Sequence, residues 1–278
     1  MVSGGILRNL RQAARLLRRR PAFTATCLAT LILGIALNTI AFGIVNALWF
    51  RPLPFPDGNR MVVLYERNVR SGARAGASYS TFRDWRDQAQ SSVSMAAVFE
   101  RSCNIAPNGS ERGIAVSVGA AFISLGAVEF MGFRPLKGRS FVPGDQNAAA
   151  RPVMIGERFW QDRFAADPEI VGRKLLVDGE EAVIVGVLPR RFQVLYGGYQ
   201  LIALLDEKGA SLDRTERVLH VVARLKPGIS LDQAQAEMEV ISARIAPEHP
   251  VSNRDWGPGY RTTGNIFLRR PSGCTRCF

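Results

Sequence analysis

The chain is poor in the residues on which catalysis and metal binding usually depend. Its 278 residues include only two histidines, His220 and His249, and four cysteines. The histidines do not have ligand spacing, and a structural zinc site needs four ligands. Only Cys274 and Cys277 form a Cys-x-x-Cys, close to the end of the sequence. Four scattered cysteines do not make a disulfide scaffold, and we interpret the final pair as incidental.

Motifs of the common nucleotide-binding and hydrolytic sites are also missing. There is no Gly-x-x-x-x-Gly-Lys-Ser/Thr loop, no Gly-x-Ser-x-Gly and no His-Glu-x-x-His. Asn108-Gly109-Ser110 matches a glycosylation sequon, but this bare three-residue match coincides with an expected turn. We therefore predict no catalytic, cofactor-binding or metal-binding residues, and a protein that is not an enzyme.

Acidic residues are absent from the first 51 positions, which carry seven arginines and no lysine. The other 227 residues hold 29 basic and 24 acidic groups, so they contribute only +5 to the net charge of +12. The positive charge thus lies beside an apolar run, where an anionic lipid surface uses it. No basic helix interleaved with stacking aromatics occurs elsewhere, and we expect no nucleic-acid partner.

The longest uncharged stretch is 30 residues, Pro21 to Phe50. A helix needs about 20 residues to cross the hydrocarbon core, whereas a secretory signal has roughly 7–15 apolar residues before a small-residue cleavage site. The run is too long for such a signal, and its end, "NALWFRPLP", offers no convincing Ala-x-Ala. Arg19-Arg20 only weakly resembles a twin-arginine signal. The sequence therefore favours an uncleaved transmembrane helix over residues 21–50.

The flanking charges predict the orientation of this helix. Six arginines precede it and Arg51 alone follows closely, so the positive-inside rule places the N-terminus in the cytoplasm. Residues 1–20 form a basic amphipathic segment that is expected to lie along the inner membrane surface. We expect a single-pass protein of the cell inner membrane, with its main domain in the periplasm or outside the cell.

Small and polar residues recur every four positions along the span, at Thr26, Thr30, Gly34 and Asn38. In lipid, helices associate through close backbone approach and shared hydrogen bonds, because apolar side chains gain little by leaving the lipid tails. We predict that this stripe packs against other membrane spans. The alternative is that the threonines bond only their own backbone.

Residues 51–58 are a proline-rich linker, and residues 59–262 predict a folded α+β domain. Strands are expected at 61–66, 94–100, 152–156 and 217–225. Asn108-Gly109 and Asp178-Gly179 predict hairpin turns, the second between 173–178 and 181–188. Helices are expected at 80–90, with Ser80 as N-cap, at 157–164, and at 231–246, where Ser230 and Gln233 form a capping box. Apolar positions of the last helix fall on one face that can cover a sheet: Leu231, Ala234, Met238, Ile241 and Ile245.

These segments together resemble the N-terminal part of MacB/FtsX-type permeases of ABC transporters, and most closely the group called acidobacterial duplicated orphan permeases. The most specific block is "LRQAARLLRRRPAFTATCLATLILGIALNTIAFGIVNALWFRPLPFPD". Further blocks are "SYSTFRDWRDQ", "FMGFRPLKGRSF", "VMIGERFWQDRFAADPEIVGRKLLVDGEEAVIVGVLP", "VVARLKPGISLDQAQAEMEVISARIAPEHP" and "NRDWG". The resemblance covers residues 7 to 262.

The resemblance implies an architecture and partners. A MacB-like periplasmic core domain at 59–262 is expected to have a porter-like βαβ part, from about 59–99 and 216–262, with an inserted mostly-β part at about 100–215. Partners are then the lipid bilayer, other permease spans or subunits and a separate ABC ATPase, which would use ATP because no cofactor is expected in this chain. The function implied is that of a membrane component of efflux or mechanotransmission.

The end of the chain departs from the family pattern. A family member continues into further spans, whereas here an atypical tail, residues 263–278, is expected to be disordered. The sequence therefore predicts an N-terminal permease fragment, truncated or frameshifted, that is not transport-competent alone. The alternative is a single-pass anchor that presents a periplasmic interaction domain without transport.

Because the apolar run is predicted to remain in the bilayer, the mature protein is expected to keep its first 50 residues and to stay in the membrane fraction after osmotic shock. N-terminal sequencing and fractionation check this. A mature protein that begins after Trp49 and is released freely by osmotic shock contradicts it.

Overall fold

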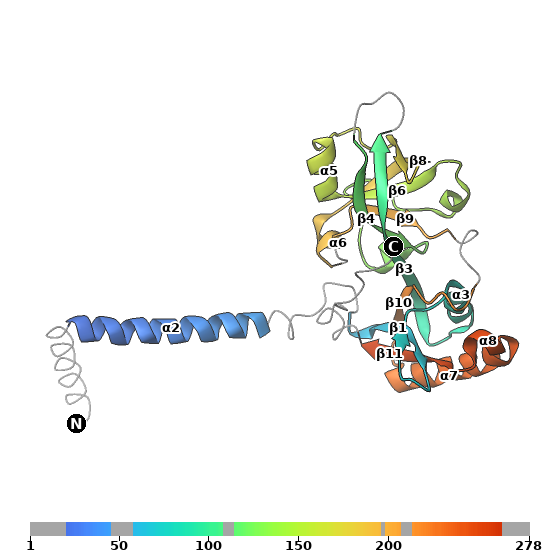
Figure 1. The fold of residues 1–278 in the computed structure, drawn as a ribbon, viewed down its shortest axis with the longest axis horizontal. Coiled ribbons are helices and arrows are strands. Elements are labelled where there is room, and N and C mark those ends of the chain that lie inside the picture. The colour runs from blue at the N-terminus through green and yellow to red at the C-terminus, as the bar shows by residue number, and fades with distance from the viewer. Residues whose placement is uncertain (1–20, 46–57, 108–113, 196–197, 207–212, 263–278) are drawn as a thin grey trace. The chain divides into compact units, whose positions relative to one another are not determined.

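The computed structural model describes residues 21–45, 58–107, 114–195, 198–206 and 213–262 (Figure 1). The chain forms two compact units, residues 1–52 and residues 53–278. The predicted turn at Asn108-Gly109, the sequon, the basic segment 1–20 and the tail 263–278 lie outside the described residues.

The first unit contains a single described helix, α2 (Pro21–Val45). Proline suits the first turn of a helix, where its missing N–H has no intrahelical acceptor. At about 1.5 Å per residue the helix is ~37 Å long, enough to cross a hydrocarbon core of ~30 Å. Its residues Thr24–Gly43 are apolar enough for a membrane span, and none of that stretch is buried within the structure. Residues 46–50 of the predicted span lie outside the described residues.

The second unit is a mixed α+β domain, as predicted. Its strands are β1 (Met61–Asn68), β2 (Arg74–Ala75), β3 (Ser92–Pro107), β4 (Val116–Ile123), β5 (Lys137–Gly138), β6 (Arg151–Gly156), β7 (Lys174–Val177), β8 (Glu180–Leu188), β9 (Leu201–Leu204), β10 (His220–Leu225) and β11 (Trp256–Thr262). Its α-helices are α3 (Tyr79–Gln88), α4 (Ala127–Phe130), α5 (Glu157–Phe164), α6 (Arg190–Leu195), α7 (Leu231–Ile245) and α8 (Pro250–Asn253). The short 3-10 turns among its described residues are η2 (Gly58–Arg60), η3 (Pro143–Asn147) and η4 (Ala246–Glu248).

Four strands form an antiparallel sheet in the order β11–β1–β10–β3. The short strand β2 pairs with Glu66 and Arg67 of β1, beyond the residues that pair with β10. Helices α3 and α7 cover one face of this sheet (Figure 1). The predicted apolar face of α7 does this: Ala234, Met238, Ile241 and Ile245 are buried. The capping box of Ser230 and Gln233 is also present, so local sequence defines this helix completely.

Helix α7 is also tied to the start of β3. The Glu237 carboxylate accepts hydrogen bonds from the backbone N–H groups of Gln90 (2.7 Å) and Ser91 (2.9 Å). Burial acts to raise the pKa of Glu237, but the side chain of Ser91 and these two backbone bonds hold it below its ordinary value. The carboxylate thus stays ionised and satisfies two N–H groups that no strand or helix neighbour takes up.

The remaining strands close into a barrel. The pairings run β3–β4–β9–β6–β8–β7 and return to β3, which gives a ring of six strands. The β4–β9 and β6–β8 pairs are parallel and the others antiparallel. Alternate residues of every strand point inward and make a single buried cluster, which includes Ile105, Ala120, Ile155, Ile184 and Ala203. Small side chains among these leave room for so narrow a barrel to close.

Each end of the barrel is covered. At the end remote from the first sheet, α5 packs Phe159 against the interior cluster (Figure 1). At the other end, the guanidinium groups of Arg101 and Arg151 lie 4.6 Å and 6.0 Å from the centroid of the buried Phe122 ring. Arg101 pairs with Asp178 at 2.6 Å and Arg151 with Glu180 at 3.2 Å. These pairs close the barrel where β7 and β8 meet.

The β7–β8 turn is the predicted one. Asp178 and Gly179 both have positive φ, 52° and 90°, as a two-residue hairpin turn requires. Asp178 also accepts a hydrogen bond from the N–H of Asn104 at 2.8 Å, which continues the β3–β7 pairing. Burial acts to raise the pKa of Asp178, but that bond and the one from Arg101 lower it below its ordinary value.

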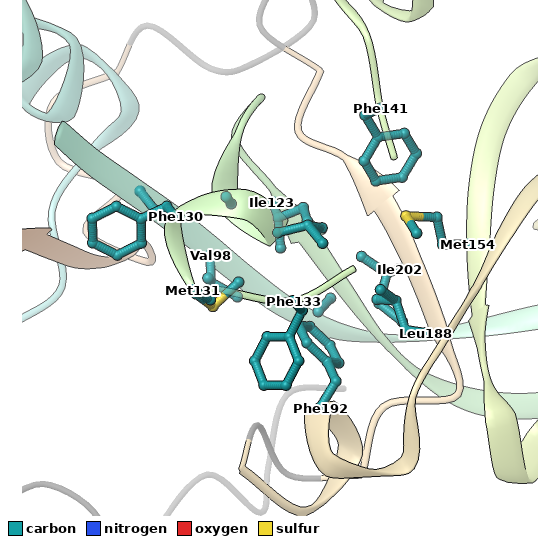
Figure 2. Packing of buried hydrophobic residues seen from close by; sticks show 14 of the residues in the cluster. Val98, Ile123, Phe130, Met131, Phe133, Phe141, Met154, Leu188, Phe192 and Ile202 are labelled. Carbon is teal, nitrogen blue, oxygen red and sulfur yellow. The ribbon is translucent and has the colours of Figure 1, made fainter. Parts of the chain in front are cut away.

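A third apolar cluster lies on the outer face of the barrel and on the second face of the first sheet (Figure 2). Met154, Leu188 and Ile202 come from barrel strands, while Met61 and Ala96 come from the first sheet. Phe133 covers them and meets Phe192 of α6 edge to face at 5.3 Å. The segment from α4 to Phe141 therefore acts as a cover over both parts of the domain.

Three of the differences between predicted and observed boundaries have a clear physical reason. The helix predicted at 80–90 begins at Tyr79, one residue earlier, and its N-cap lies two residues earlier, because Ser78, not Ser80, accepts the capping bond from the Thr81 N–H. The strand predicted at 94–100 extends to Pro107, since β4 and β7 pair with its second half. The strand predicted from 217 begins at His220, because Arg217 is engaged in an ion pair described below.

The barrel interior predicts a large energetic cost for truncation. Replacing Ile155, which is fully buried, by alanine removes methyl groups from a core that cannot collapse around them, and we expect a loss of about 2–5 kcal/mol in the free energy of unfolding. The matched control is Val240→Ala on the exposed face of α7, expected to cost less than about 0.5 kcal/mol. Urea denaturation measures both, and equal costs would contradict the closed barrel.

Candidate functional site: the apolar helix and the β1–β11 strand pair

The predicted helix-packing residues all lie on α2 and are exposed in the described structure. The hydroxyl groups of Thr26 and Thr30 donate to the carbonyl oxygens four residues earlier, at 3.0 Å and 3.1 Å. A side chain added at Gly34 meets nothing within 4 Å. Asn38 follows one turn later, so the four positions form a slanted row. Packing against other spans stays a prediction.

In the second unit, the first and last described strands are neighbours. β1 and β11 pair antiparallel from Val62 opposite Thr262 to Asn68 opposite Trp256. The start of β1 and the end of β11 therefore lie side by side at the same end of the sheet. A domain built this way can be attached at one place by both of its ends.

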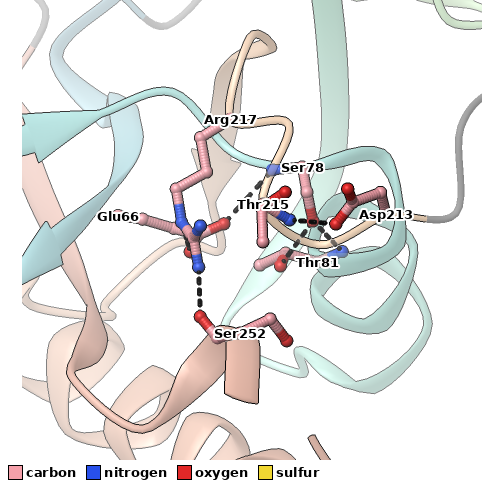
Figure 3. Close-up of polar contacts among 7 residues, drawn as sticks. All are labelled: Glu66, Ser78, Thr81, Asp213, Thr215, Arg217 and Ser252. Carbon is pink, nitrogen blue, oxygen red and sulfur yellow. Dashed lines mark hydrogen bonds and ion pairs between the residues drawn. The ribbon is translucent and has the colours of Figure 1, made fainter.

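A buried ion pair holds this strand pair together (Figure 3). Arg217 Nε lies 2.6 Å from Glu66 Oε2, and the two side chains are only 7% and 4% exposed. Arg217 Nη2 also donates to the carbonyl oxygen of Ser252 at 2.7 Å, and its guanidinium lies 4.1 Å from the centroid of the Trp256 ring. One side chain thus connects β1, α8 and β11.

The other oxygen of Glu66 reaches the helix layer. Glu66 Oε1 accepts a hydrogen bond from the backbone N–H of Ser78 at 3.2 Å. Ser78 in turn caps α3: its hydroxyl oxygen accepts from the Thr81 N–H at 3.1 Å and it shares a 2.9 Å bond with the Thr81 hydroxyl. Both carboxylate oxygens are satisfied, which a charge in this buried position requires.

The outer edge of β11 is covered by a side chain rather than by another strand. Gln235 of α7 accepts from the Tyr260 N–H at 3.1 Å and donates to the Pro258 carbonyl at 3.2 Å. Its amide therefore makes the two hydrogen bonds that a neighbouring peptide unit would make, and Pro258 has no N–H to offer.

Other chemistry is sparse in the described residues. Among them, no group of three or more His, Cys, Asp or Glu side chains converges to hold a metal ion. His220 is exposed on β10 and His249 lies between η4 and α8. Cys103 is buried in the barrel, where burial raises the pKa of its thiol to about 11.

A cavity of about 570 Å³ lies at the end of the barrel where Arg151 pairs with Glu180. It is lined by Asp145, Gln146, Ala148, Ala149, Arg151, Pro152, Glu180, Glu181, Leu204, Leu205 and Asp206. Its carboxylates are engaged: Asp145 makes two hydrogen bonds with Arg139, at 2.6 Å and 2.8 Å, which hold the pKa of Asp145 below its ordinary value. Glu180 pairs with Arg151 and Glu181 with Lys174. Because these carboxylates are paired with cations, they stabilise the surface and do not form a reactive cluster.

Sequence reasoning missed the Glu66–Arg217 pair. A signal was present, since Val62, Leu64 and Glu66 alternate on the face of β1 that packs against the helices. A carboxylate on a core-facing position requires a buried partner. The partner could not be read locally, because it lies 151 residues away.

Comparison with known proteins places these features in context. Residues 24–241 match the family model described as the MacB-like periplasmic core domain. No curated protein matches the chain. Among solved structures, the periplasmic region of MacB from Actinobacillus actinomycetemcomitans is similar with a TM-score of 0.55 at 13% identity, over 76% of this chain and 92% of that one.

Two further structures share the fold. A domain described as that of a permease protein from Porphyromonas gingivalis has a TM-score of 0.58 at 10% identity, over 75% of this chain and 92% of that one. The extracellular domain of the noncanonic ABC-type transporter YknZ from Gram-positive bacteria has a TM-score of 0.51 at 12% identity, over 72% and 99%. At such identities the likeness concerns the fold.

Loss of the cation is expected to cost much more stability in the buried Glu66–Arg217 pair than in an exposed ion pair. Arg217→Met leaves the Glu66 carboxylate buried without its cation, and we expect a loss of about 3–5 kcal/mol in the free energy of unfolding. The matched control is Arg158→Met in the exposed Arg158–Asp162 pair, expected to cost no more than about 0.5 kcal/mol. Denaturation curves measure both. A stable Arg217→Met protein whose Glu66→Gln counterpart is equally stable would show that the pair does not hold the strands.

Proposed function

The chain belongs to the family of MacB-like periplasmic core domains, and from this membership we propose that it is the N-terminal part of an ABC-type permease. In this proposal α2 is the first membrane span and the α+β unit is the extracytoplasmic domain. The role is that of a membrane component of efflux or mechanotransmission, in which a separate ABC ATPase hydrolyses ATP. Within the family, the sequence blocks given above favour the acidobacterial duplicated orphan permeases.

The observation that carries the proposal is the side-by-side position of the two ends of the domain. Because Val62 lies opposite Thr262, a displacement applied at this end of the sheet moves β1 and β11 together. Antiparallel neighbours that are pulled in the same direction keep their hydrogen bonds, whereas neighbours pulled apart lose them one after another. The Glu66–Arg217 pair then transfers the displacement to α3 and α8.

The proposed orientation follows the arginines. With six of them before the span, the N-terminus is in the cytoplasm and the domain is outside the inner membrane. This fits the exposed apolar side chains of α2, which need a lipid environment or other spans around them. The second candidate, a single-pass anchor without transport, shares this orientation and differs only in whether α2 binds other spans.

Substitution on α2 separates the two candidates. Gly34→Leu places a large side chain in the row of small and polar residues, and we expect the affinity for other permease spans or subunits to fall about tenfold, which corresponds to 1.4 kcal/mol. Asn38→Leu removes the shared amide hydrogen bonds and is expected to have a similar effect. Copurification of membrane partners after crosslinking in cells measures the loss.

Ala36→Leu is the matched control, because Ala36 is also small and exposed but lies on the opposite side of the helix from Gly34. It is expected to keep the complex. If Gly34→Leu, Asn38→Leu and Ala36→Leu all behave as the unchanged protein does, the single-pass anchor replaces the permease span.

A further inference from the structure

We propose that β3 locks the barrel and the helix-covered sheet into one rigid lever, so that the two parts of the domain do not move separately. The inference goes beyond the proposed function, since rigidity can be measured without any partner. The family resemblance predicts two parts with a boundary near residue 99, and such boundaries commonly serve as hinges. The contacts at this boundary argue against a hinge here.

The first argument is the backbone of β3 at the crossing. Val98 pairs with His220 of β10 on one side and with Ile123 of β4 on the other. One residue earlier, the Ala97 N–H donates to the Ser124 hydroxyl oxygen and the Ala97 carbonyl accepts from the Ser124 N–H, both at 3.0 Å. Ser124 is only 3% exposed. A bend at this point has to break hydrogen bonds that water cannot replace in the same geometry.

The second argument is the packing beside the crossing. Phe99 and Leu205 each contact both the barrel interior and the core beneath α3 and α7. The outer cluster also draws on both parts, since Met61 belongs to β1 and Met154 to β6. A hinge opening would expose apolar surface in all three clusters at once. Packed cores of this kind do not deform continuously.

The third argument concerns the returning chain. After β9 the chain runs back to the first sheet, and the Leu205 N–H bonds to the carbonyl of Ile123 at 2.8 Å. Arg214 then forms an ion pair with Asp84 of α3 at 2.7 Å, with side chains 10% and 18% exposed. The two described ends of this connection are thus held, Leu205 by the barrel strand β4 and Arg214 by α3. In this proposal a displacement at the β1–β11 end reaches α5 as a rotation of the whole unit.

Distances between spin labels test this directly on the full chain in detergent and in lipid nanodiscs. One label on α7 (Val240→Cys) and one on α5 (Gln161→Cys) report across the crossing. Control pairs lie within each part: Val240→Cys with Arg83→Cys, and Gln161→Cys with Lys174→Cys. All four added sites are exposed. Cys27, Cys274 and Cys277 are replaced by serine, while buried Cys103 is left in place.

A rigid lever gives a single distance distribution across the crossing, no wider than those of the two control pairs, and unchanged between detergent and nanodiscs. Two peaks, or a distribution broader than both controls, would overturn the proposal. Neither result depends on partner spans. Failure here would therefore leave the permease assignment intact, and loss of that assignment through the α2 variants would leave the rigidity intact.

Ser124 is tested separately. Ser124→Ala leaves the Ala97 N–H without its acceptor, and we expect the distribution across the crossing to widen while both control pairs keep their widths. Ser124→Thr keeps the hydroxyl and is expected to restore the original width. An unchanged distribution in Ser124→Ala would show that this clamp does not hold β3.

Discussion

Hydrogen bonding on both edges of β3 is the constraint on which the rest of this domain depends. One strand of 16 residues gives its first half to an open sheet and its second half to a closed barrel. Because a strand can be paired on two edges only, β10 and β4 fix where one structure ends and the other begins. The helix layer, the outer apolar cluster and the barrel interior are then arranged around that crossing.

Local chemistry made several elements predictable and left their assembly open. The α7 helix, its capping box and the Asp178-Gly179 turn each depend on residues within a few positions of one another, and the structure confirms them. The barrel closes through the pairing of β3 with β7, in which Ile105 lies opposite Val177. These residues are far apart in the chain, so no local sequence pattern predicts that they pair. The segments 152–156, 173–178 and 181–188 were predicted as strands, the last two as a hairpin, but nothing in them indicated that the strands close into a barrel.

The candidate site also has one part that the local sequence predicts and one part that it does not. The helix α2 could be predicted from the length of the uncharged stretch, because the bilayer imposes a simple solvent constraint. Its orientation and its packing against other spans stay predictions. The Glu66–Arg217 pair could not be predicted, although Glu66 stood out as a charge on an apolar face. Buried ion pairs often contribute little net stability, but an arrangement that leaves either charge buried and unpaired is strongly disfavoured. Here they specify which strand ends lie together, and the proposed coupling to the membrane depends on that choice.

The Gln235 amide has a further consequence for the proposed position of this domain beside a membrane. Chains confined to a plane meet at high local concentration, and an open strand edge would let neighbouring copies zip together in an uncontrolled, fibril-like manner. With Gln235 occupying the Tyr260 and Pro258 groups of β11, that edge offers no template along its middle. Neighbouring copies are therefore prevented from pairing through the middle of this β11 edge.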